Sequence, residues 1–180
     1  MSKLILFNKP YGVICQFSPD EKHKSLAEFI DIKEVYPAGR LDHDSEGLLL
    51  LTDDGKLQNK ISHPKNKMPK TYWVQVDGDI TETALEKLRK GVELKDGTTK
   101  PALAKKINSP ENLWPRDPPI RYRKDIPTSW IELTIKEGKN RQVRRMTAAA
   151  GFPTLRLIRC QIGEWSLTGI EQGKYTITNV

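Results

Sequence analysis

The residues with the clearest potential for chemistry lie in one stretch, Ala38 to Gly55, which reads AGRLDHDSEGLLLLTDDG. Asp42 and Asp44 stand beside Arg40, and the apolar run Leu48 to Leu51 follows them and ends in a turn sequence. Such a run predicts a short buried strand. We therefore expect the loop before it to be anchored on a core, and Asp42 to have poor access to bulk water. A carboxylate in that setting suits a nucleophile or a tuned base.

Three other interpretations of this stretch are open. Asp, Ser and Gly are turn formers, so the loop can be a tight turn without chemistry. A calcium loop would use the ligand spacing of Asp42, Asp44, Glu46, Gly47 and Asp53. Its ninth position is the apolar Leu50, and no amphipathic helix precedes it, which disfavours calcium. A phosphatase D-x-D loop is disfavoured because the apolar strand follows the carboxylates instead of preceding them.

The composition favours a nucleic-acid partner. The 180 residues carry a formal net charge of +7, which indicates a polyanionic ligand, although a generic basic surface would give the same excess. Arg and Lys are concentrated in three segments, Lys65 to Lys70, Arg116 to Lys124 and Lys136 to Arg145. Trp114, Tyr122 and Trp130 lie in or beside the second segment, and aromatics among cations suit stacking on unpaired bases.

Other classes of protein are disfavoured. Cys15 and Cys160 are isolated and the three histidines are scattered, so neither a disulfide scaffold nor a zinc site is predicted. The chain contains no GxGxxG or GxxxxGK[ST] motif for a dinucleotide or a nucleoside triphosphate. It also shows no apolar run long enough to span a bilayer and no secretory pattern. We expect a cytoplasmic protein without a metal.

The elements that must position these residues are many short strands interleaved with few helices. This pattern predicts an α+β (mixed α/β) domain with a mixed or antiparallel sheet and helices packed on it. The predicted strands are Lys3–Phe7, Val13–Phe17, Gly47–Thr52, Thr71–Val76, Val92–Leu94, Ala102–Ile107, Ser129–Ile135, Leu155–Ile162 and Lys174–Thr178. The predicted helices are Leu26–Ile30, Lys56–Ile61, Glu82–Lys90 and Arg141–Ala150. Five prolines make Ser109–Pro127 a loop or flap.

Asp42 needs partners, and two segments could supply them. The strand Thr71–Val76 contributes Tyr72, and the helix after Gly138 contributes several cations. Arg141 lies three and four residues before Arg144 and Arg145, so these side chains can share a helix face. By spacing alone, each arginine could equally lie on a solvated face, and Tyr72 could be a core aromatic.

Four motifs, met in order along the chain, resemble those of the pseudouridine synthases of the small- and large-subunit ribosomal RNA group. They are FNKPYGV at Phe7–Val13, GRLDHDSEGLLLLT at Gly39–Thr52, K-x-Y at Lys70–Tyr72 and EGKNRQVRRM at Glu137–Met146. The resemblance implies the fold of that family, with a largely antiparallel mixed sheet, flanking helices and a central catalytic cleft. It further implies a single catalytic domain over residues 1–180, made of two intimate subdomains that share one sheet.

The resemblance also implies a reaction without a cofactor, in which a specific uridine of 23S ribosomal RNA becomes pseudouridine. Asp42 is then the nucleophile, acting at C1′, at C6 or through a glycal. Tyr72 is expected to stack on the base, Arg144 to pair with Asp42, and Val143 to line the pocket. Arg40 is expected to fill the space that the extruded base leaves. The expected RNA contacts are Lys9, Lys70, Lys139 and Arg141.

The family's frequent N-terminal S4-type RNA-binding module is expected to be absent, because the motifs begin at the start of the chain. Leu113–Trp130 resembles a subgroup of 23S synthases that also lack it, so we expect Ser109–Pro127 to supply RNA affinity. Lys139 stands where many relatives have arginine, which keeps the charge but loses bidentate geometry. The expected partner is 23S RNA or an assembling large-subunit particle, bound by a monomer. The alternative is an RNA-binding ribosome-assembly module without catalysis.

Overall fold

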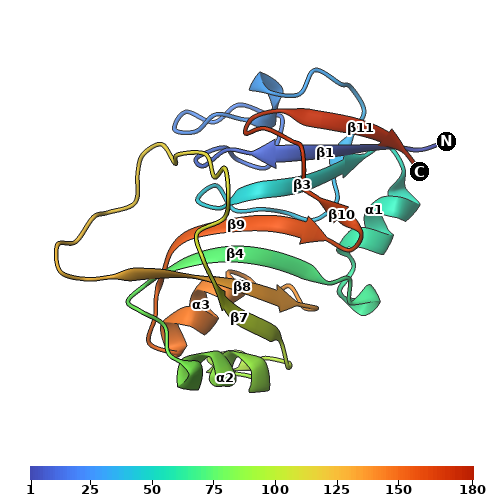
Figure 1. Ribbon diagram of the computed structural model, residues 1–180. Helices are drawn as coiled ribbons and strands as arrows, with labels where there is room; N and C mark the ends of the chain where they lie inside the picture. The colour runs from blue at the N-terminus through green and yellow to red at the C-terminus, as the bar shows by residue number, and fades with distance from the viewer. The chain divides into compact units, whose positions relative to one another are not determined.

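The computed structural model describes all residues from 1 to 180. The chain divides into two compact units, which are described separately below (Figure 1). Unit 1 comprises Met1–Met68 and Arg159–Val180, and unit 2 comprises Pro69–Ile158. Strand β9 (Thr154–Ile162) contributes residues to both units.

Unit 1 is built on antiparallel strands around β1 (Lys3–Lys9), which pairs with β11 (Tyr175–Asn179) on one side and with β3 (Glu46–Thr52) on the other. Two short strands extend this arrangement. β2 (Tyr36–Pro37) pairs with β3, and β10 (Trp165–Ser166) pairs with the end of β9. The candidate loop before β3 is thus attached to the central part of unit 1.

Strand β3 is buried over its whole length, as its run of four leucines predicts. Leu49 and Leu51 join an apolar cluster with Ile5 and Phe7, while Leu48 and Leu50 are fully buried on the other face. Burial of each leucine contributes on the order of 2 kcal/mol. The strand is therefore a stable base for the loop that precedes it.

Unit 2 pairs β4 (Lys70–Asp77) with β8 (Thr128–Ile135), and β8 with β7 (Leu103–Ile107), all antiparallel. Helices α2 (Glu82–Lys90) and α3 (Gln142–Ala149) bury their apolar faces in the same cluster as the inward side chains of β4 and β8. The fold class predicted from the sequence is confirmed, because both units combine mainly antiparallel strands with packed helices.

Capping side chains begin two of the helices. Thr81 caps α2 by accepting from the backbone of Ala84, and Asp54 caps α1 (Gly55–Ser62). The segment Ser109–Pro127 contains no helix or strand, and we call it the strap (Figure 1). Beside α2, β5 (Glu93–Leu94) and β6 (Gly97–Thr98) form a short hairpin.

Two predictions in the N-terminal part were wrong. Val13–Phe17 forms no strand, and only an isolated bridge joins Val13 to Lys24. Its apolar side chains still enter the core cluster of unit 1. The alternation of apolar residues therefore reflects burial, although the segment forms no ladder of hydrogen bonds with another strand. The predicted helix Leu26–Ile30 is a single 3₁₀ turn, η1 (Leu26–Glu28), although its capping box of Ser25 and Glu28 is present.

Gly47, near the start of β3, allows another strand to approach closely. Its φ is +105°, and a Cβ at this position would lie 2.3 Å from the backbone oxygen of Arg159. No side chain can occupy that space, and few non-glycine residues adopt this φ. The glycine therefore sets the distance between β3 and the end of β9.

We expect Gly47→Ala to lower the free energy of unfolding by at least about 3 kcal/mol, because the backbone must shift and accept a strained φ. Gly55→Ala is the matched control, since Gly55 begins α1 with no atom within 4 Å of a built Cβ. That control should change stability by less than about 1 kcal/mol. Urea denaturation of both variants measures the difference, and equal stabilities would contradict the packing described here.

Candidate active site

The loop that carries Asp42 is held in unit 1 by main-chain hydrogen bonds. The amide of Ser45 donates to the oxygen of Asp42 at 3.0 Å, and the amide of Gly12 donates to the oxygen of His43 at 2.6 Å. The Asp42 side chain itself is exposed, so its expected shielding from water was wrong. The buried strand starts only at Glu46, and the turn before it faces outward. The carboxylate is therefore open to a ligand that approaches from solution.

A buried guanidinium forms hydrogen bonds to the main chain before and after this loop. Arg159 is only 4% exposed, and its Nε donates to the oxygen of Leu48 at 2.9 Å. Its Nη1 donates to the oxygen of Arg40 at 3.2 Å. One side chain from β9 thus fixes the chain on both sides of Asp42, and charge-assisted bonds of this kind are worth about 1.5–3 kcal/mol each.

The role of Arg159 was not predicted, because the residue was considered only as part of a strand. The available signal was the presence of two arginines, Arg156 and Arg159, inside the otherwise apolar run LRLIRC. A buried arginine must find acceptors, and two main-chain oxygens near the candidate loop supply them. Arg40, by contrast, has an exposed side chain, as a residue that acts on a ligand requires.

Lys9 also supports the loop. It is fully buried, and its Nζ donates to the oxygens of Pro10 at 3.0 Å, Val13 at 2.8 Å and His43 at 3.4 Å. This burial contradicts the predicted contact of Lys9 with RNA. The ammonium instead ties the FNKPYGV segment to the residue that follows Asp42.

Burial lowers the pKa of the Lys9 ammonium to about 7. The nearby acidic groups of Cys15, Glu46 and Asp44 raise this pKa and offset only part of the effect, while the Arg159 guanidinium lowers it further. The support for the loop therefore contains a group that titrates near neutral pH.

The candidate residues of unit 2 begin with Tyr72 on β4. Tyr72 pairs with Leu133 of β8 and is 8% exposed. It belongs to the same apolar cluster as Val143 of α3, so the structure brings these two predicted residues into one core. Lys70 is half-buried on the same strand, and its Nζ would lie 3.5 Å from a Cβ built on Gly138.

The EGKNRQVRRM motif forms a turn and the first residues of α3. Gln142 stabilises the turn by two hydrogen bonds. Its Nε2 donates to Glu137 Oε2 at 2.9 Å, and its Oε1 accepts from the amide of Lys139 at 3.2 Å. Arg141 precedes the helix with a left-handed φ of +50°, and its side chain is exposed. Lys139 is half-buried. The motif thus fixes the backbone that displays its cations.

The arginines of α3 differ in their surroundings. Arg145 forms a bidentate ion pair with Asp96 at 2.7 and 3.2 Å, and this bond lowers the pKa of the Asp96 carboxyl. Arg145 therefore joins α3 to the hairpin of β5 and β6. Arg144 lies half-buried on the helix and remains the candidate for chemistry.

Nowhere do three or more His, Cys, Asp or Glu side chains gather as metal ligands would. Among the helices, none has the length and apolar character needed to cross a membrane.

Comparisons with known proteins identify the class. Residues 3–149 match the family described as RNA pseudouridylate synthase, and the chain belongs to this family. The recognition made from the four motifs is therefore confirmed.

Particular relatives refine this result. The chain is 58% identical over 173 residues to ribosomal large subunit pseudouridine synthase E of Vibrio vulnificus, covering 96% of this chain and 74% of that protein. It is 54% identical over 176 residues to the protein of the same name from Xanthomonas campestris pv. campestris, covering 97% and 94%. A crystal structure of a pseudouridylate synthase matches with a TM-score of 0.78 and 30% identity, covering 99% of this chain and 71% of that one.

The buried Lys9 makes stability depend on pH. Its pKa is about 7 in the folded chain and 10.5 without burial, so the unfolded chain binds more protons between these values. Stability therefore rises with pH across this window. We expect the free energy of unfolding of the unmodified protein, relative to Lys9→Met, to increase by a few kcal/mol between about pH 6.5 and 10.

Urea denaturation at several pH values measures this difference. Lys3→Met is the control, because Lys3 is exposed on the same strand and its ammonium stays in water in both states. The difference between Lys3→Met and the unmodified protein should stay nearly constant with pH. A constant difference for Lys9→Met as well would contradict the burial of an ionisable amine.

Proposed function

We propose that this protein isomerises a specific uridine to pseudouridine in the 23S RNA of the large ribosomal subunit, with Asp42 as the nucleophile. Membership of the pseudouridylate synthase family and similarity to relatives named for the large subunit support the reaction and the substrate. The observation that carries the role of Asp42 is its placement as an exposed carboxylate on a loop clamped by Arg159 and Lys9.

The reaction conserves every atom of the nucleotide. The bond between N1 and C1′ breaks, the uracil rotates, and a bond forms between C5 and C1′. C5 loses a proton and N1 gains one, so neither an oxidant nor a group donor is needed. The Asp42 carboxylate can attack C1′ or C6, or it can promote elimination to a glycal. Each route needs a carboxylate with little freedom, which the bracketed loop provides.

The remaining roles follow from residue chemistry. Tyr72 has an aromatic face for stacking on the base and a hydroxyl for proton transfer, and Val143 shares its apolar cluster. Arg144 is the cation proposed to pair with Asp42. Arg40, exposed next to the candidate loop, would occupy the space left by the extruded base.

Binding of the RNA must offset the cost of extrusion, which is a few kcal/mol. Lys70, Lys139 and Arg141 are the proposed phosphate contacts, and the net charge of +7 adds long-range attraction. The partner is 23S RNA or an assembling large-subunit particle in the cytoplasm, and the protein acts as a monomer.

We expect Asp42→Asn to fold and to bind RNA within about threefold of the unmodified protein, yet to lose activity by more than about a thousandfold, because an amide is a poor nucleophile. Tritium release from ribosomal RNA labelled at C5 of uridine measures the reaction. Asp31→Asn makes the same change at an exposed residue of unit 1 outside the motifs and should retain activity.

Normal release by Asp42→Asn would remove Asp42 from the mechanism. If the unmodified protein binds the RNA tightly but releases no tritium from any ribosomal RNA fragment, the alternative role in ribosome assembly without catalysis would replace this proposal.

A further inference from the structure

A cavity of about 340 Å³ lies within unit 2, outside the residues assigned to the reaction. Its wall on the sheet is formed by Gln75 of β4, Trp130 of β8 and Arg156 of β9. The volume is at the lower end of the range for small-molecule pockets, about 300–1,000 Å³. It therefore suits a group of the size of one nucleoside better than a folded segment of protein.

The opposite wall is the strap. It contributes one basic side chain, Arg116, and a mostly apolar lining. The apolar residues are Leu113, Pro115, Pro119 and Ile120. The two prolines limit the backbone freedom of this wall, and the β-branched Ile120 adds a stiff apolar side chain.

The strap is tied to the sheet at both arginines of the cavity. Arg116 donates through Nη1 to the oxygen of Leu155 at 3.1 Å. Arg156 donates through Nη2 to the oxygen of Trp114 at 2.9 Å, and its guanidinium carbon lies 5.8 Å from the centre of the Trp114 ring. The cavity is thus formed in advance, which lowers the entropic cost of binding.

The lining selects the kind of ligand. It combines an aromatic ring, apolar side chains, two guanidinium groups, the amide of Gln75 and the hydroxyl of Ser109, and it contains no carboxylate. Both guanidinium groups already donate to main-chain oxygens, and a bare phosphate would also leave the apolar wall without use. A purely apolar chain would leave the amide and the hydroxyl without use. A nucleobase suits this lining, because it stacks on aromatic or guanidinium planes and offers a polar edge to an amide or a hydroxyl.

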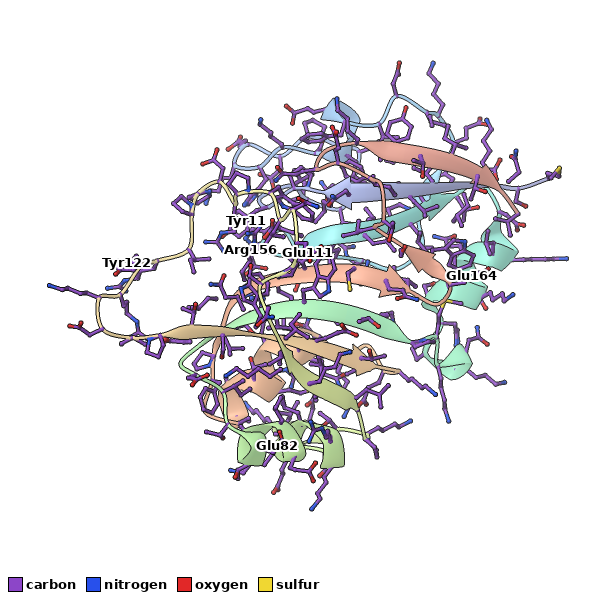
Figure 2. All side chains as sticks on the ribbon, in the orientation of Figure 1. Tyr11, Glu82, Glu111, Tyr122, Arg156 and Glu164 are labelled. Atoms are coloured by element: carbon purple, nitrogen blue, oxygen red, sulfur yellow. The ribbon has the colours of Figure 1, made fainter.

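Outside the cavity, the strap offers contacts for the rest of a nucleic-acid strand. Tyr122 is 85% exposed and lies on the outer part of the strap, while Arg156 lies on the sheet (Figure 2). Arg121 and Lys124 beside Tyr122 are also exposed, and Arg123 forms an ion pair with Asp77 of β4. Phosphates next to a base in the cavity would therefore find cations within the same segment.

We propose that the cavity beneath the strap binds one unpaired nucleobase of the RNA substrate, distinct from the uridine that is isomerised. This inference rests on the proposed function for the identity of RNA as the ligand. The bound base would determine which RNA segment the enzyme selects and would add affinity, without taking part in bond making.

The test compares two labelled RNA strands of about eight nucleotides, octauridylate and an abasic strand with the same number of phosphates. Their ratio of dissociation constants, measured by fluorescence anisotropy at one salt concentration, isolates contacts to bases from contacts to the backbone. Ile120→Trp fills the cavity from the half-buried strap side. Leu103→Trp makes the same kind of change at a 72% exposed residue of β7 that does not line the cavity.

We expect the preference for the base-bearing strand to be about tenfold smaller in Ile120→Trp than in Leu103→Trp, as the loss of one stacked base predicts. Gln75→Leu, which keeps the side-chain size and removes the amide, should also reduce the preference and provides an independent variant from the sheet side. Equal preferences in all three variants would overturn the proposal.

Tritium release separates this inference from the proposed function. If the unmodified protein releases tritium and all variants show the same preference for the base-bearing strand, the proposed cavity site is wrong and the proposed synthase activity stands. A reduced preference in Ile120→Trp without any tritium release would support the cavity as a base-binding site and contradict the catalytic proposal.

Discussion

The hydrogen bonds that Arg159 makes to the oxygens of Arg40 and Leu48 constrain the candidate loop on both sides of Asp42. Placing a cation in the interior costs several kcal/mol unless acceptors surround it. Here the acceptors are main-chain oxygens on both sides of Asp42, so the charge is stabilised only when the loop has its folded path. The close approach at Gly47 keeps the two strands near enough for these bonds.

The same principle operates at Lys9 and Gln142. Each is a buried polar side chain that holds a motif by hydrogen bonds. Lys9 donates to main-chain oxygens, and Gln142 accepts from the amide of Lys139 and donates to the carboxylate of Glu137. In both cases the residue lies inside the motif it supports, which explains why motif residues differ so much in exposure. Exposed members such as Asp42 and Arg141 are accessible from solution, and the buried members fix the backbone that carries them.

Patterns of apolar residues sufficed to predict the long elements, including β3, β4, β8 and α2, because each presents a clear period or cap. The two-residue strands β2, β6 and β10 were not predicted, because two residues are too few to show a period. The prediction of a strand at Val13–Phe17 was wrong because buried side chains in an irregular segment can alternate in the same way as those of a strand. The site was harder. Spacing pointed to Asp42 but not to its exposure, which depends on where β3 begins. The burial of Lys9 and the role of Arg159 depend on contacts between residues far apart in the chain, and no local pattern encodes them.

The anchors of the strap have an evolutionary consequence. Arg116, Arg156 and Arg123 all hold it to the strands of unit 2. Substitutions at the other positions of the strap can therefore accumulate while these three anchors keep it in place. A lineage could change which nucleotide sequence it prefers while its chemistry stays the same, and the prolines would let such variants keep a defined shape.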